Sequence, residues 1–117
     1  MKVDIEQVDR QIRNRELDEK TLLLILKNIL TIQGQATALI NPAAKAAARN
    51  VHEYVDCLIG LLPEEEELVI RTLYVEKRKW TTAEMSLHMS RNTLGRYRRK
   101  AIGMMLGIAN GTLCEPA

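Results

Sequence analysis

The sequence predicts an all-α protein, and three observations carry this prediction. Hydrophobic residues make up 46% of the 117 residues, but aromatic residues only 3%, with no Phe. A core built from Leu, Ile, Val, Met and Ala suits packed helices better than a β-sandwich. Apolar residues also recur at helical spacing, without the alternation typical of strands. Finally, Asn, Pro and Ser stand where such helices would begin.

The length and composition exclude several classes of protein. The chain is long enough for one ordinary domain or two very small ones, and too short for a two-domain enzyme. Its longest apolar run, residues 22–32, contains Lys27 and Asn28 and falls short of the roughly 20 residues that span a bilayer. The N-terminus is too acidic for a signal peptide, and Cys57 and Cys114 make no disulfide framework. We therefore expect a cytoplasmic protein with no membrane partner.

Residues 1–62 are predicted to form a helical hairpin or small bundle. Ile5, Val8 and Ile12 share one face of a short amphipathic helix, and Asp18 is a candidate cap for the next helix. The apolar residues of segment 22–32 are too dense for a single stripe. This helix must be covered on most sides by its neighbours or by a second copy of the chain, so we expect a homodimer through the N-terminal helices.

Two further helices have clear start signals. Asn41-Pro42 predicts an N-cap followed by a first helical position, and the alanines that follow let another helix approach closely. Leu62-Pro63 predicts a second start. There, Glu64 to Glu67 are expected to form a solvated first turn that stabilises the helix dipole, because consecutive helical residues diverge too much to share a metal ion. The expected buried face of this helix is Val69, Ile70, Leu73 and Tyr74.

The segment from Thr81 to Met105 is predicted to form a helix, a tight turn and a second helix. Thr81 and Glu84 have capping-box spacing, so the first helix is expected at about 82–87. The turn would pass through His88 and Met89, and Ser90 would cap the second helix. The expected inner face of that helix is Leu94, Tyr97, Ala101, Met104, Met105 and Ile108. We expect residues 63–111 to form one unit, with an end that frays between Gly107 and Gly111, and residues 112–117 to form a loose tail.

The charge distribution indicates what this unit binds. Residues 77–103 hold eight basic residues and one acid, whereas residues 1–76 hold nine basic residues and thirteen acids. In a helix-turn-helix, the start of the second helix meets base edges in the major groove. Arg pairs with guanine and Asn with adenine through two hydrogen bonds. We therefore predict base contacts from Arg91, Asn92, Thr93 and Arg96. We predict contacts to the phosphates of double-stranded DNA from Lys79, Thr81, Ser90, Arg98, Arg99 and Lys100.

The stretch from Leu62 to Met105 resembles region four of bacterial sigma factors, and more closely the small ArpU/RinA-type late transcription activators of phages. The matching residues are Leu62-Pro63, Val69-Ile70-Arg71, Tyr74, Trp80, Ser90-Arg91-Asn92-Thr93-Leu94 and Tyr97-Arg98-Arg99-Lys100-Ala101-Ile102. The resemblance covers a little over a third of the chain. It implies a phage or prophage regulator that binds DNA sequence-specifically through the second helix, and for some members contact with RNA polymerase.

Two positions depart from the family pattern. Glu84 stands where a small residue usually packs between the two helices, and His88 stands where the turn often has Gly or Asn. Glu84 fits that pattern only if the first helix is rotated or shifted. The second helix is therefore the better supported part of the motif.

Other classes of protein stay open at this point. The basic face can be an ordinary solvated face, as in an adaptor that docks on RNA polymerase or assembles phage particles, or it can belong to a DNA-packaging subunit. An enzyme is the least favoured class, because no nucleophile or acid–base pair has supporting spacing. We expect no cofactor and no metal, because neither His52 nor His88 has a second ligand at zinc spacing. Cys57 is expected to be a small buried hydrophobe. Trp80 and Tyr97 are expected to pack in the core.

Overall fold

The computed structural model describes residues 4–38 and 41–111, and within them the chain is all-helical, as predicted. The helices in order are α1 (Ile5–Arg13), α2 (Glu19–Lys27), α3 (Ile29–Ala38), α4 (Pro42–Gly60), α5 (Glu64–Ile70), α6 (Trp80–Leu87) and α7 (Arg91–Ala109). A π-helical segment, η1 (Arg71–Val75), continues α5. The predicted tail at residues 112–117 lies outside the described residues. Of the helices described, none has the length and apolarity to cross a membrane.

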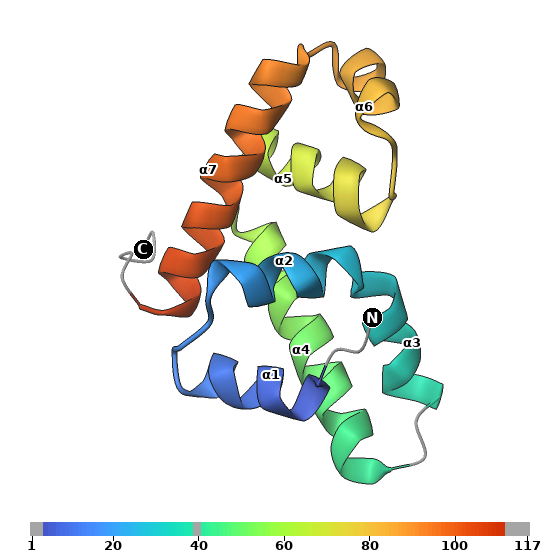
Figure 1. Ribbon diagram of the computed structural model, residues 1–117, viewed down its shortest axis with the longest axis vertical. Helices are drawn as coiled ribbons and strands as arrows, with labels where there is room; N and C mark the ends of the chain where they lie inside the picture. The colour runs from blue at the N-terminus through green and yellow to red at the C-terminus, as the bar shows by residue number, and fades with distance from the viewer. Residues whose placement is uncertain (1–3, 39–40, 112–117) are drawn as a thin grey trace.

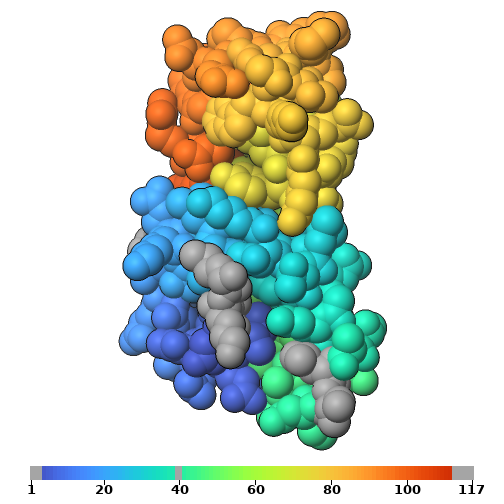
Figure 2. Space-filling view, turned by 45° about the vertical axis from the view of Figure 1, so that its right-hand side comes forward, coloured from blue at the N-terminus to red at the C-terminus, as the bar shows by residue number. Residues whose placement is uncertain are grey.

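The N-terminal helices gather around α4. Both α1 and α3 pack against this helix, and α7 runs along the side of the molecule from α6 down to the end where α1 and α2 lie (Figure 1). The alanine-rich start of α4 allows the close contact, since Ala47 and Ala48 are buried there. Figure 2 shows the two groups of helices stacked along the long axis of the molecule.

The helix starts agree with the expected capping chemistry in the N-terminal half. Asp18 Oδ1 accepts a 2.7 Å hydrogen bond from the backbone N–H of Thr21, and this bond lowers the pKa of Asp18 below its ordinary value. Asn41 Oδ1 accepts hydrogen bonds from Ala43 and Ala44, and Pro42 takes the first helical position. These caps satisfy N–H groups that have no partner inside the helix.

The expectation of one helix over residues 22–32 is wrong, because the helix is interrupted at Asn28. Asn28 Nδ2 donates a 2.8 Å hydrogen bond to the carbonyl oxygen of Leu24, and its backbone leaves the α region with φ −117° and ψ 19°. A side-chain amide that bonds the backbone in this way competes with the helical hydrogen-bond ladder. The interruption separates α2 from α3. Gly34, in contrast, lies inside α3 without ending it.

The acidic first turn of α5 is not wholly solvated, which corrects the prediction. Glu66 is 2% exposed, and its Oε1 lies 3.5 Å from Nζ of Lys100 on α7. A glutamate is rarely buried without a partner, and the residue lies here because α5 packs against α7. Its neighbour Glu67 accepts a 2.9 Å hydrogen bond from Arg71, which raises the pKa of the guanidinium. Arg71 also pairs with Asp56, so it ties α5 to α4.

The main core draws on both halves of the chain. It contains buried residues of α1 to α4 together with Ile70, Ala101, Ile102, Met105 and Ala109. The boundary expected between residues 62 and 63 falls in the loop between α4 and α5, but the core continues across it. The second half of α7 is therefore anchored among the N-terminal helices, whereas its first half extends beyond them (Figure 1).

The C-terminal end of α7 is held in place, contrary to the expected fraying. Asn110 Oδ1 accepts a 3.0 Å hydrogen bond from the backbone N–H of Leu17, and its Nδ2 donates a 2.8 Å bond to the carbonyl of the same residue. Leu17 is buried, as is Ala109 in the last turn. The amide side chain of Asn110 thus pairs both backbone groups of Leu17, in the loop between α1 and α2.

Cys57 is exposed, so the prediction of a buried cysteine is also wrong. Val55, Leu58 and Ile59 take the buried positions of this part of α4. Residue 57 then faces the opposite side of the helix, because positions three and four apart share one face.

Candidate nucleic-acid interface

The predicted helix-turn-helix is formed by α6 and the first half of α7. Ser90 caps α7 as expected, since its Oγ accepts a 3.2 Å hydrogen bond from the N–H of Thr93. The cap expected at Thr81 is wrong. The first helix begins at Trp80, directly after Lys79, and no side chain caps it. Thr81 therefore lies within the first turn of α6.

The turn between the two helices contains an unusual backbone conformation. His88 ends α6 in the left-handed conformation, with φ 55° and ψ 43°. This conformation disfavours any residue that carries a Cβ, and glycine adopts it freely.

Replacing His88 by Gly should therefore raise the free energy of unfolding by about 0.5–1 kcal/mol, because the relief of the left-handed strain exceeds the extra freedom of the unfolded chain. The His88→Ala variant is the matched control, because it removes the imidazole and keeps the Cβ. Urea denaturation of both variants measures the difference. A glycine variant no more stable than the alanine variant would contradict the strain argument.

A small second core clamps the inner side of α7. Leu94 is fully buried together with Val69 of α5 and Ala83 of α6, and Trp80 and Tyr97 pack around them half-buried, as expected. Ala83, and not Glu84, is the small residue that packs between α6 and α7. The first helix is therefore shifted by one position from the alignment that placed Glu84 at this contact. Glu84 lies half-buried beside this contact, and its Oε2 is 3.8 Å from Nε of Arg91.

The outer side of the same helix carries an exposed polar row. Asn92, Arg96 and Arg99 are all exposed, and their spacing of four and three residues places them on one face. Among the described residues, none of the three has an acidic partner within ion-pair distance. These side chains are therefore available to a ligand on this face. We call Asn92, Arg96 and Arg99 the outer row.

A hollow of about 490 Å³ adjoins the outer row. Its wall contains Trp80, Arg91, Gly95 and Arg98. Apart from the chain neighbours of Gly95 and the backbone of its own helix, no atom lies within 4 Å of the place where a Cβ of residue 95 would stand. Since no internal contact requires a glycine there, the space above Gly95 is open to an approaching molecule.

Two of the predicted arginines lie against Trp80. The guanidinium carbons of Arg91 and Arg98 are each 5.9 Å from the centre of the indole ring, within reach of a cation–π interaction. Arg91 remains 60% exposed. Arg98 instead lies inward, where its Nη1 donates a 3.1 Å hydrogen bond to the hydroxyl of Tyr74. In this position Arg98 fixes α7 against η1, and it is less available to a phosphate than Arg99.

The other predicted contact residues are distributed around the edge of this face. Ser90 is exposed, but Thr93 is half-buried and its hydroxyl shares a 3.0 Å hydrogen bond with the Ser90 hydroxyl. Thr93 therefore serves the cap of α7. Lys100 is 64% exposed and pairs with Glu66. Lys79 and Thr81 are exposed at the start of α6, where the helix dipole favours an anion.

The sequence analysis missed two residues that shape this surface. Tyr74 was expected only on a buried face, and Glu66 only in a solvated turn. Their partners Arg98 and Lys100 lie 24 and 34 positions further along the chain, so no local pattern joins them. In the described segments 4–38 and 41–111, no group of three or more His, Cys, Asp or Glu side chains gathers as a metal site.

Comparison with known proteins adds no relative to this picture. No protein-family model, no curated protein and no solved structure matches the chain.

Proposed function

We propose that this protein is a sequence-specific DNA-binding regulator of transcription that reads the major groove with the first half of α7. The observation that supports this proposal is the outer row, exposed on a helix whose opposite side is clamped by Leu94. A recognition helix needs a rigid inner side and long hydrogen-bonding side chains on the outer side. Arg and Asn are the side chains best suited to guanine and adenine.

The charges around the outer row fit a duplex. Three basic side chains are exposed on α7, namely those of Arg91, Arg99 and Lys100. Lys79 is exposed directly before the start of α6. Phosphate contacts of this kind position a protein on DNA, whereas base contacts specify the sequence. We assign base contacts to Asn92, Arg96 and Arg91, and phosphate contacts to Lys79, Arg99 and Lys100. Thr93 and Arg98 act by holding α7 in place.

Two substitutions test the two kinds of contact. A cognate site is first selected from random DNA. Arg96→Ala should then weaken binding to that site by about 1–3 kcal/mol and weaken non-specific binding much less. Arg99→Ala should weaken binding to every sequence and reduce the slope of log affinity against log salt by about one unit.

The control for both is Arg49→Ala, which removes an exposed arginine from α4. It should leave the affinity for DNA unchanged. Equal losses on all sequences for Arg96→Ala and Arg99→Ala would reduce the function to non-specific binding. An undiminished affinity for both variants would show that the outer row does not contact DNA. Failure to select any bound DNA would favour the alternative, a helical adaptor that docks on RNA polymerase or a phage assembly without contact to DNA.

Self-association through the N-terminal helices is a separate hypothesis. Leu22, Ile25, Leu26, Ile29 and Ile32 are buried within the chain, and Leu30 is 44% exposed. The chain itself therefore covers most of the apolar segment that suggested a homodimer. Sedimentation equilibrium at high concentration decides the question, and a stable monomer would remove the hypothesis while leaving DNA binding by a single copy.

A further inference from the structure

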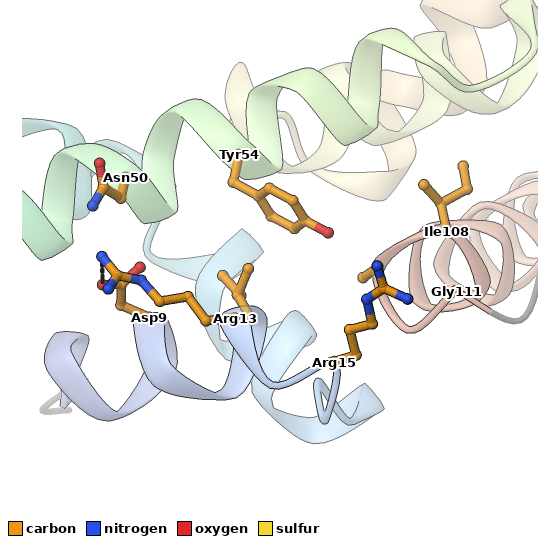
Figure 3. A pocket seen from close by; sticks show the side chains of 9 residues that line it. Asp9, Arg13, Arg15, Asn50, Tyr54, Ile108 and Gly111 are labelled. Atoms are coloured by element: carbon orange, nitrogen blue, oxygen red, sulfur yellow. Dashed lines mark ion pairs between the residues drawn. The ribbon is translucent and has the colours of Figure 1, made fainter. Parts of the chain in front are cut away.

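A pocket opens at the end of α7 opposite to the outer row. It has a volume of about 600 Å³ and lies between α1, α4 and the last turn of α7 (Figure 3). Pockets that hold small organic molecules commonly have volumes of about 300–1,000 Å³. Ile12 and Ile108 supply apolar wall, while Arg13, Arg15, Asn50 and Tyr54 add polar groups.

The charges of this pocket are unequal. Asp9 is the acid in its wall, and it is already paired with Arg13, whose Nη2 lies 3.1 Å from Asp9 Oδ2. Arg15 has no acidic partner among the described residues. Figure 3 shows the Arg15 side chain among the lining residues, next to the end of α7 that carries Ile108 and Gly111. The pocket therefore presents one uncompensated positive charge next to an apolar wall.

The surrounding structure imposes this position on Arg15. Its backbone is left-handed, with φ 58°, a conformation that is uncommon for residues with a Cβ. A Cβ at position 111 would lie 3.2 Å from Arg15 Nη1, so a glycine there leaves room for the guanidinium. The hydrogen bonds between Asn110 and Leu17 hold the two segments together. Strain of this kind persists where the fold over-determines it, often at ligand sites.

We infer that this pocket binds a small organic anion whose carboxylate or phosphate pairs with Arg15 and whose apolar body lies against Ile12 and Ile108. A charge-assisted hydrogen bond to an arginine is about twice as strong as a neutral one. The apolar wall adds affinity for a hydrocarbon or aromatic body, so such an anion should bind more tightly than a simple inorganic ion.

The pocket and the outer row share one helix. Ile108 lies in the last turn of α7, and Arg96 lies in its first half. A ligand whose affinity differs between the free and the DNA-bound protein changes DNA affinity by the same factor. This consequence rests on the proposed function, whereas binding of the anion does not.

The test is a titration followed by backbone amide NMR with three probes: benzoate, phenyl phosphate and benzamide. We expect benzoate or phenyl phosphate to shift the amide signals of Ile12, Tyr54 and Ile108, and the better of the two to identify the anionic group. Benzamide has the shape of benzoate without its charge, and it should bind about tenfold more weakly.

The decisive variant is Arg15→Gly, which removes the guanidinium and relieves the left-handed backbone, so the variant should fold at least as well. It should bind the preferred anion about tenfold more weakly. Lys77→Gly is the matched control, because Lys77 has φ 54° and lies outside the pocket. This control should bind the anion as the unmodified protein does.

Three results would overturn the inference: no signal shift with either anion, equal affinity for benzamide and benzoate, or full affinity in Arg15→Gly. These results are independent of DNA. A protein that binds benzoate at Arg15 and fails to bind any duplex would refute the proposed function and leave the pocket assignment intact.

Discussion

Replacing Leu94 by alanine should lower the free energy of unfolding by about 2–5 kcal/mol, the range observed for buried leucines. Leu94 is 0% exposed and stands at the centre of the small core that also contains Val69 and Ala83. This core joins α5, α6 and the first half of α7. Removal of the side chain loses its transfer free energy and leaves a cavity between three helices, which cannot close without moving α6.

Urea denaturation measures the loss, and Leu68→Ala is the matched control. Leu68 is 45% exposed on α5, so the same change of residue type should cost less than about 1 kcal/mol. Hydrogen exchange adds a second measurement. Because the main core lies around α4, amides of α6 in Leu94→Ala should lose protection before those of α4 do. Equal costs at positions 94 and 68 would show that the second core contributes no stability of its own.

Replacing Asn110 by alanine should lower the free energy of unfolding by about 2–4 kcal/mol, because it leaves both backbone groups of a buried residue without a partner. The amide of Asn110 accepts from the N–H of Leu17 and donates to its carbonyl, at 3.0 and 2.8 Å. Leu17 is 2% exposed, so water cannot readily replace the lost bonds.

Two variants separate this effect from a general cost of mutation. Asn110→Asp keeps the acceptor for the Leu17 N–H and loses the donor to the carbonyl, so it should be less stable than the unmodified protein. Asn14→Ala changes an exposed asparagine that follows α1, and it should stay within about 0.5 kcal/mol of the unmodified protein. Thermal unfolding followed by circular dichroism compares all three. An Asn110→Ala variant as stable as Asn14→Ala would show that the two hydrogen bonds contribute nothing.

The parts of the fold that could be predicted are those in which the interacting residues lie a few positions apart in the chain. Asp18 and Ser90 cap their helices with hydrogen bonds to residues three positions ahead, and Asn41 does so two and three positions ahead. The buried position of Leu94 follows from helical spacing. The exposure of the outer row follows from the same period, because polar residues opposite a buried stripe face outward.

The parts that could not be predicted depend on partners distant in sequence. A capping box at Thr81 was a reasonable local pattern, but α6 starts two residues earlier, at Trp80, which packs in the second core. Arg98 carries a side chain suited to a phosphate contact, yet its hydrogen bond to the hydroxyl of Tyr74 holds it inward. Asn110 pairs with a residue 93 positions away, so an apparently fraying end is fixed.

The sequence by itself thus determined the helical class of this protein, most of its helix starts and the two-sided character of its last helix. Helical periodicity and capping are local, and each is complete within a few residues. Only the tertiary structure decided which charges stay available. Tyr74 of η1 holds Arg98 inward, and packing of α5 against α7 pairs Lys100 with Glu66, whereas Arg15 stays without an acidic partner at the edge of a pocket. Burial and charge pairing depend on tertiary contacts between segments that are distant in sequence. The spacing of residues along the chain does not predict those contacts.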